Sequence, residues 1–326
     1  MGKDKDMSVR KKKIPYGVKQ ESLLRNTWKN RTLVCMVLPV VILLILFNYI
    51  PMFGLLVAFK DFNYTDGILH SPWVGFQNFK FLFSMKDLTI RMLRNTVGYY
   101  LLFTAVGTVL NVALALGLNQ CRNKYFTKYS HAVMILPTFI SFIAVTYIVE
   151  CFLNHTNGML NGLLQTFGNE PVRWYAEAKY WPLILTIVNV WKGTGYGAVL
   201  YLSALSGIDG ELYEAADLDG ATGWQKVKYI DIPMLVSMIC IVTLMGVGGI
   251  MSSNTGLFYQ VTKDSSMIYE TTQTIDTYVL KTLVKSGLND FGPSTAVTMF
   301  QSVVGCIACL AANAVTRRVS PENALF

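Results

Sequence analysis

The sequence predicts an all-α integral membrane protein with six transmembrane helices. Hydrophobic residues make up 52% of its 326 residues, and charged residues only 15%. The apolar residues gather in runs long enough to cross the roughly 30 Å of bilayer hydrocarbon as helices, and no small soluble core could bury runs of that length. We therefore expect one membrane domain and not two soluble domains.

Five segments lack acidic and basic residues over most of their length, and a sixth is interrupted only by Lys192. Because each is long enough to span the bilayer, we assign all six as transmembrane helices. The predicted spans are approximately 33–59, 95–121, 129–152, 181–205, 232–255 and 293–316.

The distribution of basic residues predicts the orientation. The net charge is +8, and ten of the 28 Lys and Arg residues precede residue 32, which indicates a membrane-proximal tail and not a nucleic-acid-binding surface. With both termini in the cytoplasm, the internal segments hold 17 basic residues and the longer external loops hold ten. The predicted organisation is a basic cytoplasmic tail with a possible short helix (1–32), a membrane domain (33–316) with an internal loop (207–233) and external loops (60–94, 153–180, 256–292), and a cytoplasmic C-terminal tail (317–326).

The last external loop is expected to be partly helical, because Ile268, Ile275 and Tyr278 recur at spacings near 3.6 residues. Two roles remain open for it. It could dock a soluble partner outside the membrane, or it could simply cap the helix bundle.

The internal loop 207–233 carries the strongest functional signal, since it predicts two short capped helices. Asp209 can cap the first helix and Gly220 can end it in a left-handed turn. Thr222 and Gln225 have the spacing of a capping box for a second helix that runs to about residue 230, and Pro233 then opens the next span. So short a helix is marginal alone in water, and we expect the first one to dock in a groove of another protein.

This loop resembles the EAA loop of the permease subunits of binding-protein-dependent ABC importers. The matching pattern is Glu214-Ala215-Ala216, three residues, Gly220, nine residues and Ile230-x-Ile232-Pro233, with Ile232 at a position where the family usually has Leu. The resemblance implies a type I ABC importer permease fold. It also implies that the loop is a coupling helix in a groove of the ATPase subunit. On this basis the predicted coupling residues are Glu214, Ala215, Ala216 and Gly220.

The resemblance covers most of the chain. Within the family, the sequence is similar to the LplB-type branch of polysaccharide and oligosaccharide permeases. The segments that carry it include 73–79, 94–96, 211–216, 275–278 and 300–305. It implies a bacterial plasma-membrane protein that imports a saccharide of the oligosaccharide class. It also implies a second permease, two ATPase subunits and an extracellular solute-binding lipoprotein as partners.

No covalent chemistry is predicted for the chain itself. The sequence contains no G-x-x-x-x-G-K-[ST] motif, and its three histidines are far apart, so neither a phosphate-binding loop nor a metal site is indicated. We expect no catalytic residue, no metal and no cofactor in this chain. The resemblance implies that ATP and Mg²⁺ bind to the partner ATPase subunits.

Lys192 is a candidate for the substrate path, because a cation near the middle of a span is costly unless it faces a cavity, a carboxylate or backbone carbonyls. Its neighbours Asn189, Trp191 and Tyr196 offer the hydrogen-bonding groups and aromatic surface that a sugar needs. The alternative is a structural role for Lys192 in neutralising or bonding across a subunit interface.

A secondary transporter driven by an ion gradient is the competing function. It would also present apolar spans, a buried cation and no nucleotide motif. The capped double helix and the lack of any acidic residue within the apolar spans to bind a proton or cation favour the importer permease. A membrane-embedded enzyme is weaker still, because paired catalytic groups are not evident.

Overall fold

The computed structural model describes residues 30–121, 123–285 and 291–325. In these residues the regular elements are helices and helical turns, and the only bridge of β type joins Lys60 and Trp73. The chain divides into two compact units, residues 1–54 and 55–326. The predicted short helix of the basic tail falls almost wholly on residues 1–29, which lie outside the described residues.

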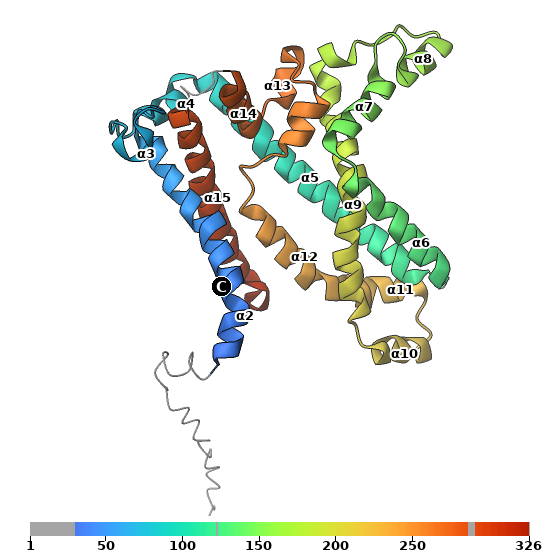
Figure 1. The fold of residues 1–326 in the computed structure, drawn as a ribbon. Coiled ribbons are helices and arrows are strands. Elements are labelled where there is room, and N and C mark those ends of the chain that lie inside the picture. The colour runs from blue at the N-terminus through green and yellow to red at the C-terminus, as the bar shows by residue number, and fades with distance from the viewer. Residues whose placement is uncertain (1–29, 122, 286–290, 326) are drawn as a thin grey trace, which may run out of the picture. The chain divides into compact units, whose positions relative to one another are not determined.

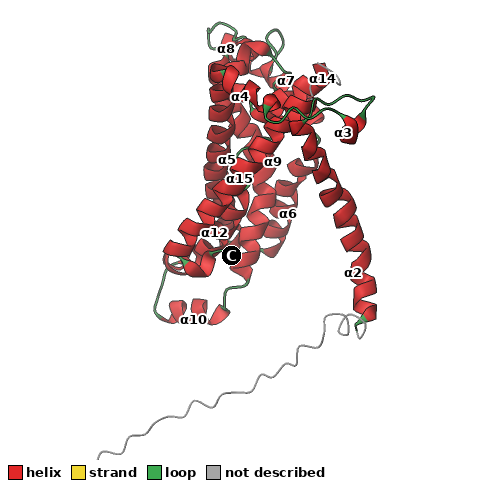
Figure 2. Ribbon diagram, turned by 90° about the vertical axis from the view of Figure 1, so that its left-hand side faces the viewer, coloured by secondary structure: helices red, strands yellow, loops and turns green. Residues whose placement is uncertain are grey.

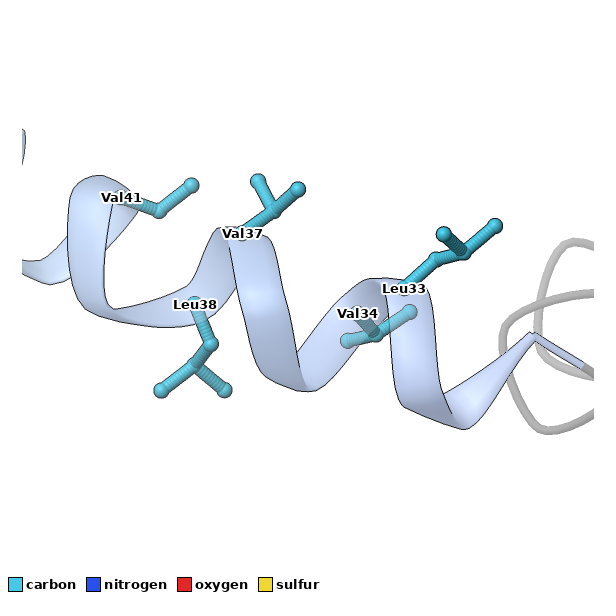
Figure 3. A pocket seen from close by; sticks show the side chains of 5 residues that line it. All are labelled: Leu33, Val34, Val37, Leu38 and Val41. Carbon is cyan, nitrogen blue, oxygen red and sulfur yellow. The ribbon is translucent and has the colours of Figure 1, made fainter.

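The first unit is built on the first predicted span. Helix α2 (Arg31–Leu44) continues through a π turn (Ile45–Tyr49) into a 3-10 segment (Ile50–Phe59). The π turn directly precedes Pro51, whose ring cannot fit against the carbonyl four residues earlier in a regular helix. Figure 3 shows Leu33, Val37 and Val41 pointing to the same side of α2, as a spacing of four residues requires. Such an apolar surface suits contact with lipid.

The second unit is a bundle of long helices with short elements at its two ends (Figures 1 and 2). The long helices are α5 (Lys86–Gln120), α9 (Trp181–Ser206), α12 (Ile232–Val247) and α15 (Phe291–Val319). Helix α10 (Gly210–Leu218) lies at one end of the bundle. At the opposite end lie α3 (Gly67–His70), α4 (Lys80–Ser84), α8 (Met159–Thr166), α13 (Tyr269–Thr272) and α14 (Ile275–Lys285).

Three buried clusters hold this bundle together. Near the end that carries α8, Tyr99 of α5 packs with Leu185 of α9 and with Phe258 of the π turn Gly256–Val261. A second cluster joins the start of α5 to α14 and α15. Toward the α10 end, Ala115 of α5 packs with Tyr201 of α9 and with Leu235 of α12. Helices α5 and α9 both contribute to the first and the third of these clusters, so their contact runs along most of the bundle.

The predicted spans are present, with two differences at their ends. Helix α5 begins at Lys86, nine residues before the predicted span, because its first turns carry charged side chains that a rule based on uncharged length leaves out. Helix α12 ends at Val247 and not near residue 255. Just after α12 ends, the backbone lies close to α15, since the carbonyl oxygen of Gly248 would lie 2.4 Å from a Cβ added at Gly305 of α15. The last external loop is partly helical, as predicted, with α13 and α14.

The span predicted over 129–152 is present as a bent pair of helices and not as one continuous helix. The chain forms α6 (Lys124–Ile135), a 3-10 turn (Leu136–Phe139) and α7 (Phe142–Leu153), and the helical segments meet at a bend of 98°. Pro137 starts the 3-10 turn, and the Ser141 hydroxyl caps the new helix by accepting from the Ala144 N–H at 3.2 Å. Among the described residues, five helices are long and apolar enough to span a membrane, or six if the bent pair is counted as one span.

The bend exposes backbone carbonyls that a continuous helix would pair, and Lys192 of α9 satisfies them. Its ammonium donates to the carbonyl oxygens of Pro137 (3.2 Å), Thr138 (2.9 Å) and Ile140 (2.5 Å). The Thr138 hydroxyl donates in return to the Lys192 carbonyl at 2.9 Å. The ammonium also lies 4.9 Å from the centre of the Phe142 ring. Since an ammonium has three N–H donors, these three carbonyls use all of them.

Gly195 brings α9 close to the same bend. A Cβ added at this residue would lie 1.8 Å from the carbonyl oxygen of Met134, at the end of α6. Gly193, two residues earlier, has no atom within 4 Å of such a Cβ. The absence of a side chain at Gly195 is therefore what lets the two backbones meet.

We predict that Gly195→Ala destabilises the bundle by about 1–3 kcal/mol, because the added methyl group pushes α9 away from α6. Gly193→Ala is the matched control and should be neutral, or stabilising by up to about 1 kcal/mol. Thermal unfolding of the purified protein in detergent measures both changes. Equal midpoints for the two variants would contradict the close contact.

We predict that Lys192→Met lowers the thermal midpoint more than Lys179→Met does, because it leaves three carbonyls of the bend without a donor. Each unpaired buried carbonyl costs roughly 1–3 kcal/mol. Lys179 is a suitable control because its side chain is 67% exposed and its contacts with Glu177 and with the Tyr180 ring lie at the surface. Indistinguishable midpoints would mean that the bend does not depend on Lys192.

Candidate functional site

Helix α10 is capped as its sequence predicts. The Asp209 carboxylate accepts from the backbone N–H of Glu211 at 3.1 Å. At the other end Gly220 has φ +74°, a left-handed conformation that lets the Ala221 N–H reach the Ala216 carbonyl at 2.9 Å. Both ends of this short helix are thus fixed by local residues.

The second predicted helix of the loop is present but is not separate from the next span. Thr222 and Gln225 form a capping box at the start of α11 (Gly223–Lys226). The chain then continues through a π turn (Val227–Asp231) into α12, so that Gly223–Val247 is one continuous helix. As before Pro51, the π turn here precedes a proline, Pro233, whose ring it accommodates.

The residues predicted to couple to a partner lie on the surface of α10. Glu214 and Ala215 are exposed and Ala216 is half-buried, while Gly220 lies in the exposed turn that follows. Leu218, at the end of the helix, is 90% exposed. A carboxylate, two methyl side chains and an unburied leucine on a helix at the end of a bundle form a low surface that another protein can approach closely.

A buried network ties α10 to the bundle, and it includes a residue that sequence reasoning missed. The Tyr213 hydroxyl donates to Asp231 Oδ1 at 2.5 Å, and the Gln120 amide donates to Asp231 Oδ2 at 3.3 Å. Asp231 has no exposed surface. It is the unspecified residue between Ile230 and Ile232 in the loop pattern. In the sequence, the sign of this role is an acidic residue two positions before Pro233, the proline that opens an apolar span.

The pKa of Tyr213 is raised to about 12, first by burial and then by its hydrogen bond to Asp231 and by the charge of that carboxylate. A raised pKa keeps the phenol protonated at all pH values below it. The hydroxyl therefore remains a donor to Asp231 over the whole physiological range.

The four residues predicted for a substrate path do not share one face of α9. Asn189 and Tyr196 are seven residues apart and lie on the same side, because two helical turns separate them. Trp191 is two residues from Asn189, about 200° around the helix, and lies on the other side. Tyr196 is 60% exposed and Trp191 42% exposed. The Lys192 ammonium is engaged with the carbonyls of the bend, as described above.

Acidic residues do occur in the helical spans of the described chain, which weakens one argument made from the sequence against an ion-driven transporter. Asp87 lies in the first turn of α5. Asp231 lies in the helix Gly223–Val247, and Glu150 lies in α7. Glu150 forms an ion pair with Lys263. Asp231 is held by Tyr213 and Gln120.

At the end opposite α10, the segment Arg94-Asn95-Thr96 binds the backbone of the last external loop. The Asn95 amide donates to the carbonyls of Glu270 (3.1 Å) and Gln273 (3.0 Å), and the Arg94 guanidinium donates to Glu270 at 2.9 Å. The Thr96 hydroxyl accepts from the Ile275 N–H at 3.1 Å. This explains why three consecutive polar residues stand at the start of an apolar run.

Comparison with known proteins gives a consistent result. A family model described as the inner membrane component of binding-protein-dependent transport systems matches residues 104–321. The polygalacturonan/rhamnogalacturonan transport system permease protein YteP of Bacillus subtilis is 30% identical over 94% of this chain and 94% of its own. Protein LplB of the same organism is 31% identical over 93% of this chain and 92% of its own.

Solved structures agree. A chain of a bacterial ABC transporter involved in the import of the acidic polysaccharide alginate matches with a TM-score of 0.80 and 30% identity, covering 92% of this chain and all of that one. The same score, with 29% identity, is found for the alginate transporter in complex with an alginate pentasaccharide-bound periplasmic protein. The chain belongs to the family of inner membrane components of binding-protein-dependent transport systems.

Proposed function

We propose that this chain is a permease subunit of an ABC importer that takes up oligosaccharides through a path shared with a second permease. Two ATPase subunits bind ATP and Mg²⁺, and α10 is the helix that couples their movement to the membrane bundle. The observation that carries the coupling role is the capped, exposed α10 with Glu214 on its surface, at the end of the bundle opposite the α13 and α14 loops.

The saccharide class is supported by the names of the relatives, which describe transport of polygalacturonan/rhamnogalacturonan, galactooligosaccharides and lactose. An extracellular solute-binding protein is the expected donor of the saccharide, in line with the family description and with the periplasmic protein in the related alginate complex. The orientation that agrees with this role places α10 and both termini in the cytoplasm. It is the orientation that the basic residues of the sequence favour.

A secondary transporter is not favoured. The buried Asp231 is held by two neutral donors at the foot of α12, and Glu150 is paired with Lys263, so neither carboxylate resembles an open ion site in mid-membrane. The match of family and fold to ABC importer permeases points the same way.

For the sugar path we propose the face of α9 that carries Asn189 and Tyr196. The ring of Tyr196 offers an aromatic surface for the C–H face of a sugar, and Asn189 offers donor and acceptor groups for hydroxyls. Lys192 lies close to this face, but its three N–H donors are bonded to the carbonyls of the bend between α6 and α7. We therefore assign it a structural role, which is to hold α9 against that bend. Trp191 lies on the other side of the helix.

We predict that Glu214→Arg releases the ATPase from the complex, because it reverses the charge at the coupling surface. The charge-matched control is Glu170→Arg, an exposed glutamate of the external loop that follows α8. Co-purification of the ATPase and saccharide-stimulated ATP hydrolysis should both fall at least about tenfold for the first variant, as expected for a charge-assisted contact, and remain normal for the second. Full co-purification and stimulation with Glu214→Arg would rule out the coupling role.

We predict that Tyr196→Ala lowers the saccharide transport rate about fivefold at a saturating concentration of loaded binding protein, since an aromatic contact contributes roughly 1 kcal/mol. Trp191→Ala removes a ring from the opposite side of α9 and should change the rate less than about twofold. Uptake into proteoliposomes with a labelled saccharide measures both. The proposed face is wrong if the two variants are affected in the reverse order.

A further inference from the structure

The Asp231 carboxylate joins three elements at the foot of the bundle. Its two oxygens accept from Tyr213 of α10 at 2.5 Å and from Gln120, the last residue of α5, at 3.3 Å. Asp231 itself ends the π turn that leads into α12. One buried side chain thus contacts the helix proposed to couple and the last residue of α5, and it stands at the start of α12.

The contact is strong because the carboxylate has few alternatives. In the described part of the chain no Lys, Arg or His nitrogen lies within 4 Å of it. A buried carboxylate without a nearby cation depends on its neutral donors, and hydrogen bonds to a charged acceptor are about twice as strong as neutral ones. The Tyr213 hydroxyl therefore cannot leave Asp231 without a large energetic cost.

A second tie between α10 and the following helix is weaker. Lys226 bonds to Asp217 at 2.5 Å, but the Asp217 side chain is 64% exposed. Exposed ion pairs are screened by salt and contribute little. Of these two side-chain contacts, the one between Tyr213 and the fully buried Asp231 is accordingly the better shielded from solvent.

The position of Asp231 also matters. It lies on a π turn, where the helical hydrogen bonding is irregular, two residues before Pro233, which donates no backbone hydrogen bond. A helix adjusts its direction most easily at such a point. A displacement of α10 that pulls on Asp231 is therefore applied where α12 can respond.

We propose that Tyr213 and Asp231 are a positioning pair that transmits movement of α10 to α12 and α5. This inference rests on the proposed coupling role of α10. Neither residue touches ATP or the saccharide. The pair differs from Glu214 in its task, because Glu214 holds the partner while Tyr213 and Asp231 connect the held helix to the spans.

The test uses the complete transporter in proteoliposomes, with its second permease, ATPase subunits and binding protein. Tyr213→Phe removes only the hydroxyl, so the ring still packs. We expect normal co-purification of the ATPase and sustained ATP hydrolysis, with saccharide uptake per ATP hydrolysed reduced about tenfold or more, as for the loss of a hydrogen bond to a charged group. Tyr229→Phe, on the same π turn with a ring that is 67% exposed, is the matched control and should keep the wild-type ratio.

Asp231→Asn keeps the size of the side chain and supplies a second variant. If the two residues act as one unit, the double variant Tyr213→Phe/Asp231→Asn should lower uptake per ATP no further than the more affected single variant. Additive losses would overturn the pair. Wild-type uptake per ATP with Tyr213→Phe would also overturn it, as would loss of the ATPase from that variant, since the hydroxyl would then serve docking.

Failure of this inference can be told apart from failure of the proposed function. If Glu214→Arg leaves the ATPase bound and active, the coupling role of α10 fails whatever Tyr213→Phe does. If Glu214→Arg releases the ATPase while Tyr213→Phe transports with normal efficiency, only the positioning pair fails.

Discussion

Polar groups inside hydrocarbon must find partners within the protein, and the structure depends on how this chain meets that requirement. The bend between α6 and α7 exposes carbonyls, and α9 places a lysine ammonium among them. An unpaired cation and an unpaired stretch of backbone would each be costly, but together they satisfy one another. In the same way, the Asn95 amide donates to backbone carbonyls of residues 270 and 273, and the Tyr213 hydroxyl donates to the Asp231 carboxylate.

These contacts divide the bundle into a fixed part and a part suited to movement. The α5–α9 pair carries buried clusters along its length and is pinned to α6 by Lys192 and Gly195. Helix α10, in contrast, projects from the end with both termini capped and its carboxylate and small side chains exposed. A rigid frame with one projecting helix, joined to it at a buried point beside a π turn, is the arrangement that a mechanical coupling element needs.

Local features could be predicted from the sequence, and features that depend on distant contacts could not. The caps of α10 and α11 follow from Asp209, Thr222, Gln225 and Gly220, which act within a few residues, and the long apolar runs gave the spans and the fold class. The bend between α6 and α7 has local signals in Pro137 and Ser141. Its acceptance inside an apolar span is not visible locally, because the donor to its carbonyls is a lysine more than fifty residues away. Asp231 was missed because a span defined by uncharged residues excludes it, and Trp191 was grouped with Asn189 because neighbours in sequence were treated as neighbours on the helix.

The most direct test of the central claim is the contact made by the tip of α10 in the assembled transporter. A single cysteine at Leu218→Cys, in a background without the native cysteines, should cross-link to the ATPase subunit and react with an impermeant reagent only from the cytoplasmic side. Leu69→Cys, at the other end of the bundle and 79% exposed, should do neither. Reaction of the Leu218→Cys variant from outside the cell, or no cross-link to the ATPase in an active complex, would contradict the account.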